Sequence, residues 1–128
     1  MTDMRRYDPM QAPDPEDWLA LDEQERISFA LGYHRRPEVK LPNAQVHAVI
    51  HAVVETQIAM GDEIPVSRTV ERLQEEGLDR HDAIHAVGSV LIKHMHALMN
   101  KNTLDGDPNQ AYWSELARLT AKKWKRSH

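Results

Sequence analysis

Two pairs of histidines, each pair four residues apart, are the residues whose types and spacing best support chemistry in this chain. His47 and His51 form the first pair, and His81 and His85 form the second. Both pairs share the pattern H-x-x-I-H-A-V. Residues i and i+4 lie one turn apart on the same side of a helix, so each pair places two imidazoles on one helix face. Neutral imidazole is the commonest protein ligand for transition-metal ions.

The first pair lies on an apolar helix face. Val54 and Ile58 fall beside the two histidines, and Glu55 follows His51 by four residues at the edge of that face. Imidazoles and a carboxylate on the buried side of a helix need polar partners, because a buried polar group without one is costly. We therefore expect Glu55 to be an auxiliary ligand. His34, at the end of the preceding expected helix, is a second candidate ligand or hydrogen-bonding group.

Our hypothesis is that the two histidine helices face each other and hold one divalent transition-metal ion between them. The expected ions are Zn, Fe or Ni, and the expected ligands are His47, His51, His81, His85, Glu55 and His34. The HExxH motif of zinc proteases is absent, because Ala48 and Asp82 follow the first histidine of each pair. A carboxylate-rich di-iron site is disfavoured too, since only Glu55 is well placed. The sequence leaves open whether the site is catalytic or structural.

The same histidines also fit a structural role. They would then form a buried hydrogen-bonded cluster or line a dimer seam, and the chain would be a helical protein–protein interaction module, such as a homodimer. A packed cluster of four imidazoles without metal has coupled pKa values, because protonating one penalises the others. A bound metal removes that difficulty.

Composition indicates an ordinary soluble domain. The chain has 128 residues, a formal net charge of −4 and no cysteine, which excludes a disulfide framework and thiolate metal sites. No apolar run approaches the roughly 20 residues that cross a bilayer, and the N-terminal sequence has no apolar signal region. We expect a cytoplasmic protein of bacterial type that does not enter a membrane.

The hydrophobic pattern predicts an all-α fold, a small bundle of five or six helices in one domain over residues 15–128. Residues 1–14, rich in Pro and Asp, are expected to form an irregular arm. Six expected helices begin near Pro15, after Asp22, at Asn43, at Ser67, at Asp79 and at Ala111. Glu25 completes a capping box with Asp22, and Gly77 ends the fourth helix. The expected core stripe of the fifth helix is Ile84, Val87, Leu91, Met95 and Leu98.

The last expected helix, residues 111–126, is basic. Its cations are Arg118, Lys122, Lys123, Lys125 and Arg126. Such a segment could contact nucleic acid or an acidic partner. Because the rest of the chain is acidic, we favour a solvated helix end whose cations complement the helix dipole, and we do not expect nucleic-acid binding.

Four segments together resemble a known family. They are WLALDEQER from residue 18, YHRRP at 33–37, PNAQVHAVIHAVVETQIA at 42–59 and EGLDRHDAIHAVGSVL at 76–91. The combination is similar to a bacterial family catalogued as domain of unknown function eighteen forty-one, over roughly residues 15–99, with the two HxxxH helices as the specific part. The resemblance implies that the histidines act as a unit and implies no activity.

Overall fold

The computed structural model describes residues 7–34, 44–100 and 108–127 of the chain. Within these ranges every regular element is helical and no strand is present, so the predicted all-α class is confirmed. None of the helices in these ranges combines the length and apolar character needed to cross a bilayer. The contacts divide the chain into two compact units, Met1–Ser67 and Arg68–His128, and each is described by itself.

The described residues of the first unit form three α-helices and a short 3-10 turn. Their bounds are Pro15–Ala20 for α1, Glu23–His34 for α2, Ala44–Ala59 for α3 and Gly61–Glu63 for η1. Asp14 caps α1, because its side chain accepts the backbone N–H groups of Glu16 and Asp17. The expected capping box of α2 is confirmed: the Glu25 N–H donates to Asp22 Oδ1 at 2.8 Å, and the Asp22 N–H donates to Glu25 Oε1 at 3.0 Å. The expected cap of α3, Asn43, lies outside the described residues.

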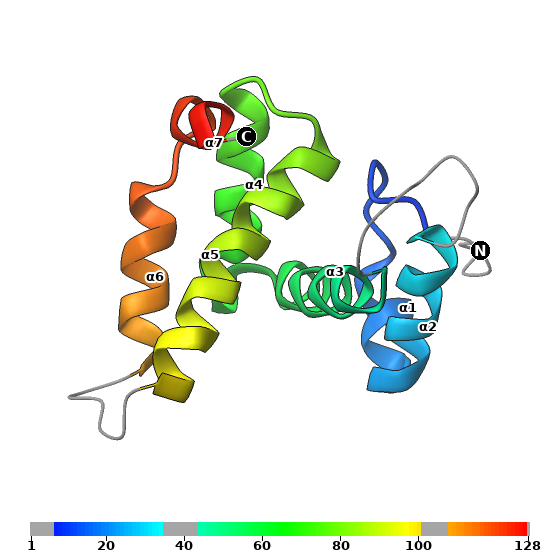
Figure 1. Ribbon diagram of the computed structural model, residues 1–128. Helices are drawn as coiled ribbons and strands as arrows, with labels where there is room; N and C mark the ends of the chain where they lie inside the picture. The colour runs from blue at the N-terminus through cyan, green and yellow to red at the C-terminus, as the bar shows by residue number, and fades with distance from the viewer. Residues whose placement is uncertain (1–6, 35–43, 101–107, 128) are drawn as a thin grey trace. The chain divides into compact units, whose positions relative to one another are not determined.

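Helices α1 and α2 both pack against α3 (Figure 1). Trp18 of α1 is buried in the core of this unit together with Ala30, Ala48 and Ala52. Its indole Nε1–H donates to Thr56 Oγ1 on α3 at 3.1 Å. Arg26 of α2 donates to the same hydroxyl at 3.3 Å, so one α3 side chain connects all three helices. These contacts hold α1 and α2 against α3, the helix that carries His51.

The second unit, which begins at Arg68, contains most of α4 (Val66–Glu75) together with α5 (Arg80–Asn100), α6 (Pro108–Arg118) and α7 (Ala121–Ser127). Helix α4 begins before Ser67, which therefore lies inside its first turn rather than at the cap. The turn from α4 to α5 is closed as expected by Gly77, whose φ is 110°. The Leu78 N–H bonds to the Leu73 carbonyl at 3.1 Å and the Gly77 N–H bonds to the Gln74 carbonyl at 3.0 Å, which is the Schellman arrangement.

The single basic helix expected over residues 111–126 is two helices in the structure, α6 and α7, separated by Leu119 and Thr120. The hydroxyl of Thr120 accepts the Lys123 N–H at 3.1 Å and so begins α7. Residues at the end of α4 bond to the backbone at this break. Arg72 donates to the Leu116 carbonyl at 3.0 Å. The Ala121 N–H donates to Glu76 Oε1 at 2.9 Å. Backbone groups that would continue one helix are therefore bonded to Arg72 of α4 and to Glu76, the residue after α4.

Helix α5 packs against α6 and α7. Its expected core stripe is buried at Ile84, Val87 and Leu91, but Met95 is 45% exposed. The prediction that Met95 is a core residue is therefore wrong. Apolar spacing predicts which residues share a helix face, whereas burial depends on whether a partner covers that part of the helix.

Candidate metal centre

A buried hydrogen-bonded group surrounds His51 in the middle of α3. His51 and Glu55 are both almost completely excluded from solvent, with exposed fractions of 0% and 1%. The hydroxyl of Tyr7 lies 3.0 Å from Nδ1 of His51 and donates to Glu55 Oε2 at 2.5 Å. The histidine and the carboxylate, one helical turn apart, are therefore connected by a tyrosine from the N-terminal segment.

This geometry favours a neutral His51 with its proton on Nδ1. The Tyr7 hydroxyl has one hydrogen, and that hydrogen is donated to Glu55. Its oxygen can then interact favourably with His51 only by accepting the Nδ1–H. In the neutral imidazole with Nδ1 protonated, the lone pair is on Nε2. In metal sites, a hydrogen bond to one ring nitrogen of a ligand histidine orients the other nitrogen in this way.

The segment before α1 brings Tyr7 to α3. The Tyr7 ring is buried, packs on Trp18 with centroids 6.0 Å apart, and meets the His51 ring edge-on at 5.7 Å. Asp8 begins a turn, since its carbonyl accepts the Gln11 N–H at 3.0 Å and its carboxylate accepts the Met10 N–H at 2.9 Å. This local turn and the Trp18 contact hold the phenol in place.

The second histidine pair lies in the first two turns of α5. The rings of His81 and His85 are 4.3 Å apart between centroids and inclined by 63°, which confirms that the pair shares one helix face. Asp79 caps this helix, as expected, by accepting the Asp82 N–H at 2.7 Å. Both imidazoles are half-buried. The cap sets the start of the helix, and the four-residue spacing then brings the two rings together.

Three described histidines, His51, His81 and His85, each offer one ring nitrogen that could bind a metal ion. His51 belongs to the first unit, and His81 and His85 belong to the second. All three belong to the predicted ligand set. His47 is half-buried on α3, one turn before His51, and is not among these three histidines. His34 ends α2, and its side chain lies outside the described residues.

Glu55 belongs to the buried network around His51. Its carboxylate accepts the Tyr7 hydroxyl, so it is connected to the histidine through the tyrosine. In metal sites, partners of this kind set the tautomer and orientation of a ligand histidine. Sequence reasoning identified Glu55 but missed Tyr7. No periodic or spacing signal marks Tyr7, because it lies in an irregular segment 44 residues from His51.

Comparison with family models, with curated proteins and with solved structures gives no match for this chain. The assignment to domain of unknown function eighteen forty-one therefore stays a prediction.

Proposed function

We propose that this chain is a small helical metal-binding protein in which His51, His81 and His85 bind one divalent transition-metal ion. Three imidazoles are a ligand set suited to Zn, Fe or Ni. The proposal is supported by the His81 and His85 rings, which lie 4.3 Å apart on one face of α5. It is also supported by the repeated HxxxH pattern that supplies them.

The observation that carries the proposal is the hydrogen-bonded chain from Glu55 through Tyr7 to His51. Burying a histidine and a carboxylate costs free energy, and a simple core position needs neither. A buried carboxylate that holds an imidazole in one tautomer is the arrangement repeatedly found behind metal-binding histidines. The network therefore favours a ligand role for His51 over a packing role.

The fourth coordination position decides what the bound ion does. Three histidines leave one position of a tetrahedral ion for another ligand. If His47 fills it, the site is closed and the metal is structural. If water fills it, the site has the composition of catalytic zinc centres, in which the ion lowers the pKa of the bound water.

The test is elemental analysis of purified, untagged protein by plasma mass spectrometry, before and after incubation with Zn, Fe or Ni and removal of free ion. We compare the parent with the His51→Ala/His85→Ala double variant and with His96→Ala, an exposed histidine of the same helix α5. We expect near-stoichiometric metal in the parent and in His96→Ala, and none in the double variant. A parent that stays empty, or a double variant that retains the metal, would overturn the proposal.

A His47→Ala variant separates the two kinds of site. Loss of metal and a marked fall in melting temperature are expected if His47 closes the coordination sphere. Retained metal with exchangeable bound water, detected by X-ray absorption on the Zn-loaded protein, is expected if the position is open. Circular dichroism on each variant checks that the helices persist.

A second candidate function is a protein–protein interaction module, and one observation favours it. Ile92, Met95 and Met99 follow helical spacing along α5 and are 38%, 45% and 79% exposed. Exposed apolar side chains in a row are typical of interaction faces, and methionine suits such surfaces. We propose a homodimer through this face as the alternative. Sedimentation of the parent and a Met95→Ser/Met99→Ser variant tests it, because only a dimer through α5 would dissociate.

A further inference from the structure

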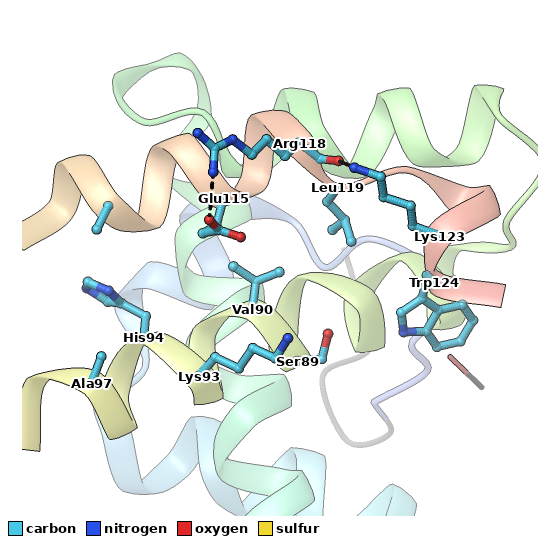
Figure 2. Close-up of a pocket in the computed structure, with 11 residues that line it drawn as sticks. Ser89, Val90, Lys93, His94, Ala97, Glu115, Arg118, Leu119, Lys123 and Trp124 are labelled. Atoms are coloured by element: carbon cyan, nitrogen blue, oxygen red, sulfur yellow. Dashed lines mark hydrogen bonds and ion pairs between the residues drawn. The ribbon is translucent and has the colours of Figure 1, made fainter. Parts of the chain in front are cut away.

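A cavity of about 600 Å³ lies within the second unit and is bounded by α5, α6 and α7 (Figure 2). Its volume is in the range of small-molecule sites, roughly 300–1,000 Å³. The histidines of the candidate metal centre do not line it. It is therefore a separate site, and the residues that line it determine which ligand it can bind.

The charged groups around this cavity favour an anion. Lys93, Arg118 and Lys123 line it, against a single carboxylate, Glu115. Arg118 pairs with Glu115 at 3.3 Å, and both side chains are mostly exposed, so this pair is weak. Lys123 Nζ donates to the Arg118 carbonyl at 3.3 Å. Three cations against one carboxylate leave an excess of two positive charges at the cavity.

Lys93 differs from the other two cations. Among the residues that the structure describes, it makes no hydrogen bond or ion pair. Its side chain extends from the middle of α5 along that helix toward Ser89 (Figure 2). An ammonium group in a cavity wall can give all three of its N–H donors to a bound anion. Lys93 is thus the natural anchor for a negatively charged ligand.

The rest of the cavity wall is mainly apolar. Val90 from α5 and Leu119 from the segment after α6 both extend toward the cavity, and Trp124 of α7 lies at one end (Figure 2). His94 is at the other end, and its ring stacks on Tyr112 with centroids 5.4 Å apart and planes inclined by 14°. Flat rings at both ends and aliphatic groups between them suit a planar apolar ligand body.

We propose that this cavity binds a small aromatic carboxylate. The carboxylate would accept hydrogen bonds from the Lys93 ammonium, and the ring would lie among Val90, Leu119 and the Trp124 indole. A mostly apolar wall with a few cationic groups favours a largely apolar monoanion over a nucleic acid, which needs a cationic surface along its backbone.

The experiment uses naphthalene-1-acetate as the probe and naphthalene-1-acetamide as its neutral analogue. Binding to the full chain is measured by ¹⁵N–¹H NMR titration and calorimetry. Three proteins are compared: the parent, Lys93→Gln and the matched control Lys122→Gln, an exposed lysine of α7 that does not line the cavity. We expect the acetate to bind the parent with shifts at α5, α6 and α7. The acetamide should bind the parent roughly tenfold more weakly than the acetate does. Lys93→Gln should bind the acetate roughly tenfold more weakly than the parent does, the effect of losing a hydrogen bond to a charged group. Lys122→Gln should bind like the parent.

Three outcomes would overturn the proposal. The first is the absence of binding at about 1 mM acetate, because a specific site for this ligand would have a lower dissociation constant than that. The second is equal binding of acetate and acetamide, which removes the anchoring role of charge. The third is displacement of the probe by mixed-sequence duplex DNA with a steep salt dependence, which would assign the cations to nucleic acid. Trp124→Leu gives an independent check, since it should weaken both ligands by removing the flat surface while leaving the preference for the acetate.

Discussion

The Tyr7 hydroxyl donates a 2.5 Å hydrogen bond to the Glu55 carboxylate, joining two residues 48 positions apart in a fully buried site. The same hydroxyl lies 3.0 Å from His51 Nδ1. One phenol therefore donates to the buried carboxylate and lies against the histidine Nδ1, which favours the tautomer with Nδ1 protonated. The relationship makes the N-terminal segment part of the candidate metal centre, and it leads to the first prediction.

Replacing Tyr7 by Phe should weaken metal binding by about 10- to 100-fold, the usual effect of removing a group behind a metal ligand. It should also lower the free energy of unfolding of the metal-free protein by about 1–3 kcal/mol, because Glu55 loses a buried donor. Chelator competition measures the first effect, and urea denaturation measures the second. Long-range ¹⁵N–¹H NMR should show protonated Nδ1 on His51 in the parent and a mixture of tautomers in the variant.

Tyr112→Phe is the matched control for this change, since Tyr112 is a buried tyrosine of the second unit. It should leave metal affinity unchanged. Equal metal affinity in the parent and Tyr7→Phe would show that the phenol does not act on a ligand.

Replacing Thr56 by Val should destabilise the first unit by about 1–3 kcal/mol. The variant keeps the side-chain shape but removes the oxygen that accepts both the Trp18 indole N–H at 3.1 Å and an Arg26 N–H at 3.3 Å. Trp18 is 1% exposed, so water does not replace the lost acceptor. Urea denaturation followed by tryptophan fluorescence measures the change. Ser28→Ala, at an exposed position of α2, should change stability by less than about 0.5 kcal/mol.

Glu76 should contribute a pH-dependent part of the stability. The Ala121 N–H, and then the Arg72 side chain, hold the pKa of this carboxyl below its usual value. A carboxyl with a lowered pKa in the folded state stabilises the protein above the unfolded value, roughly pH 4. That contribution is lost as the pH falls through the lower, folded value.

Glu76→Gln should therefore lower stability at pH 7 and change it much less at pH 3. The difference should be below about 1 kcal/mol, because solvent screens this partly exposed group. Urea denaturation at both pH values measures it, with Glu75→Gln as the neighbouring exposed control. A Glu76→Gln effect that is the same at both pH values would contradict the assigned role.

Replacing Gly77 by Ala should destabilise the second unit by about 1–2 kcal/mol. Gly77 has a φ of 110°, a conformation that an L side chain rarely adopts. A Cβ there would meet only the Lys125 ammonium, at 3.9 Å, so the cost comes from the backbone and not from a clash. Thermal unfolding measures the effect. Gln74→Ala, at an exposed position near the same helix end, should change stability by less than about 0.5 kcal/mol. An unchanged melting temperature in Gly77→Ala would show that this turn has another accessible form.

Local sequence signals predicted most of the helices because the interactions that form them connect near neighbours. The Asp22–Glu25 capping box, the Asp79 cap and the Gly77 turn each close hydrogen bonds within six residues. The HxxxH spacing likewise predicts that His81 and His85 share a face, and their rings are 4.3 Å apart. Helical periodicity and capping are therefore enough to give the all-α class.

Tertiary contacts decided the features that depend on residues far apart in the chain. The break between α6 and α7 is held by Arg72 and Glu76, 44 and 45 residues from their partners. The exposure of Met95 depends on which part of α5 is covered, and apolar spacing does not report that. Each feature results from a pairing that no local pattern encodes.

The candidate site divides in the same way. The residue types and spacing in the sequence determine which histidines share helix faces, because helix geometry is periodic. The tertiary structure decides that Tyr7, from an irregular segment, reaches His51 and Glu55. Packing of Tyr7 against Trp18 places the hydroxyl there, and a buried hydrogen bond depends on the position of both partners in space and not on their separation in the chain.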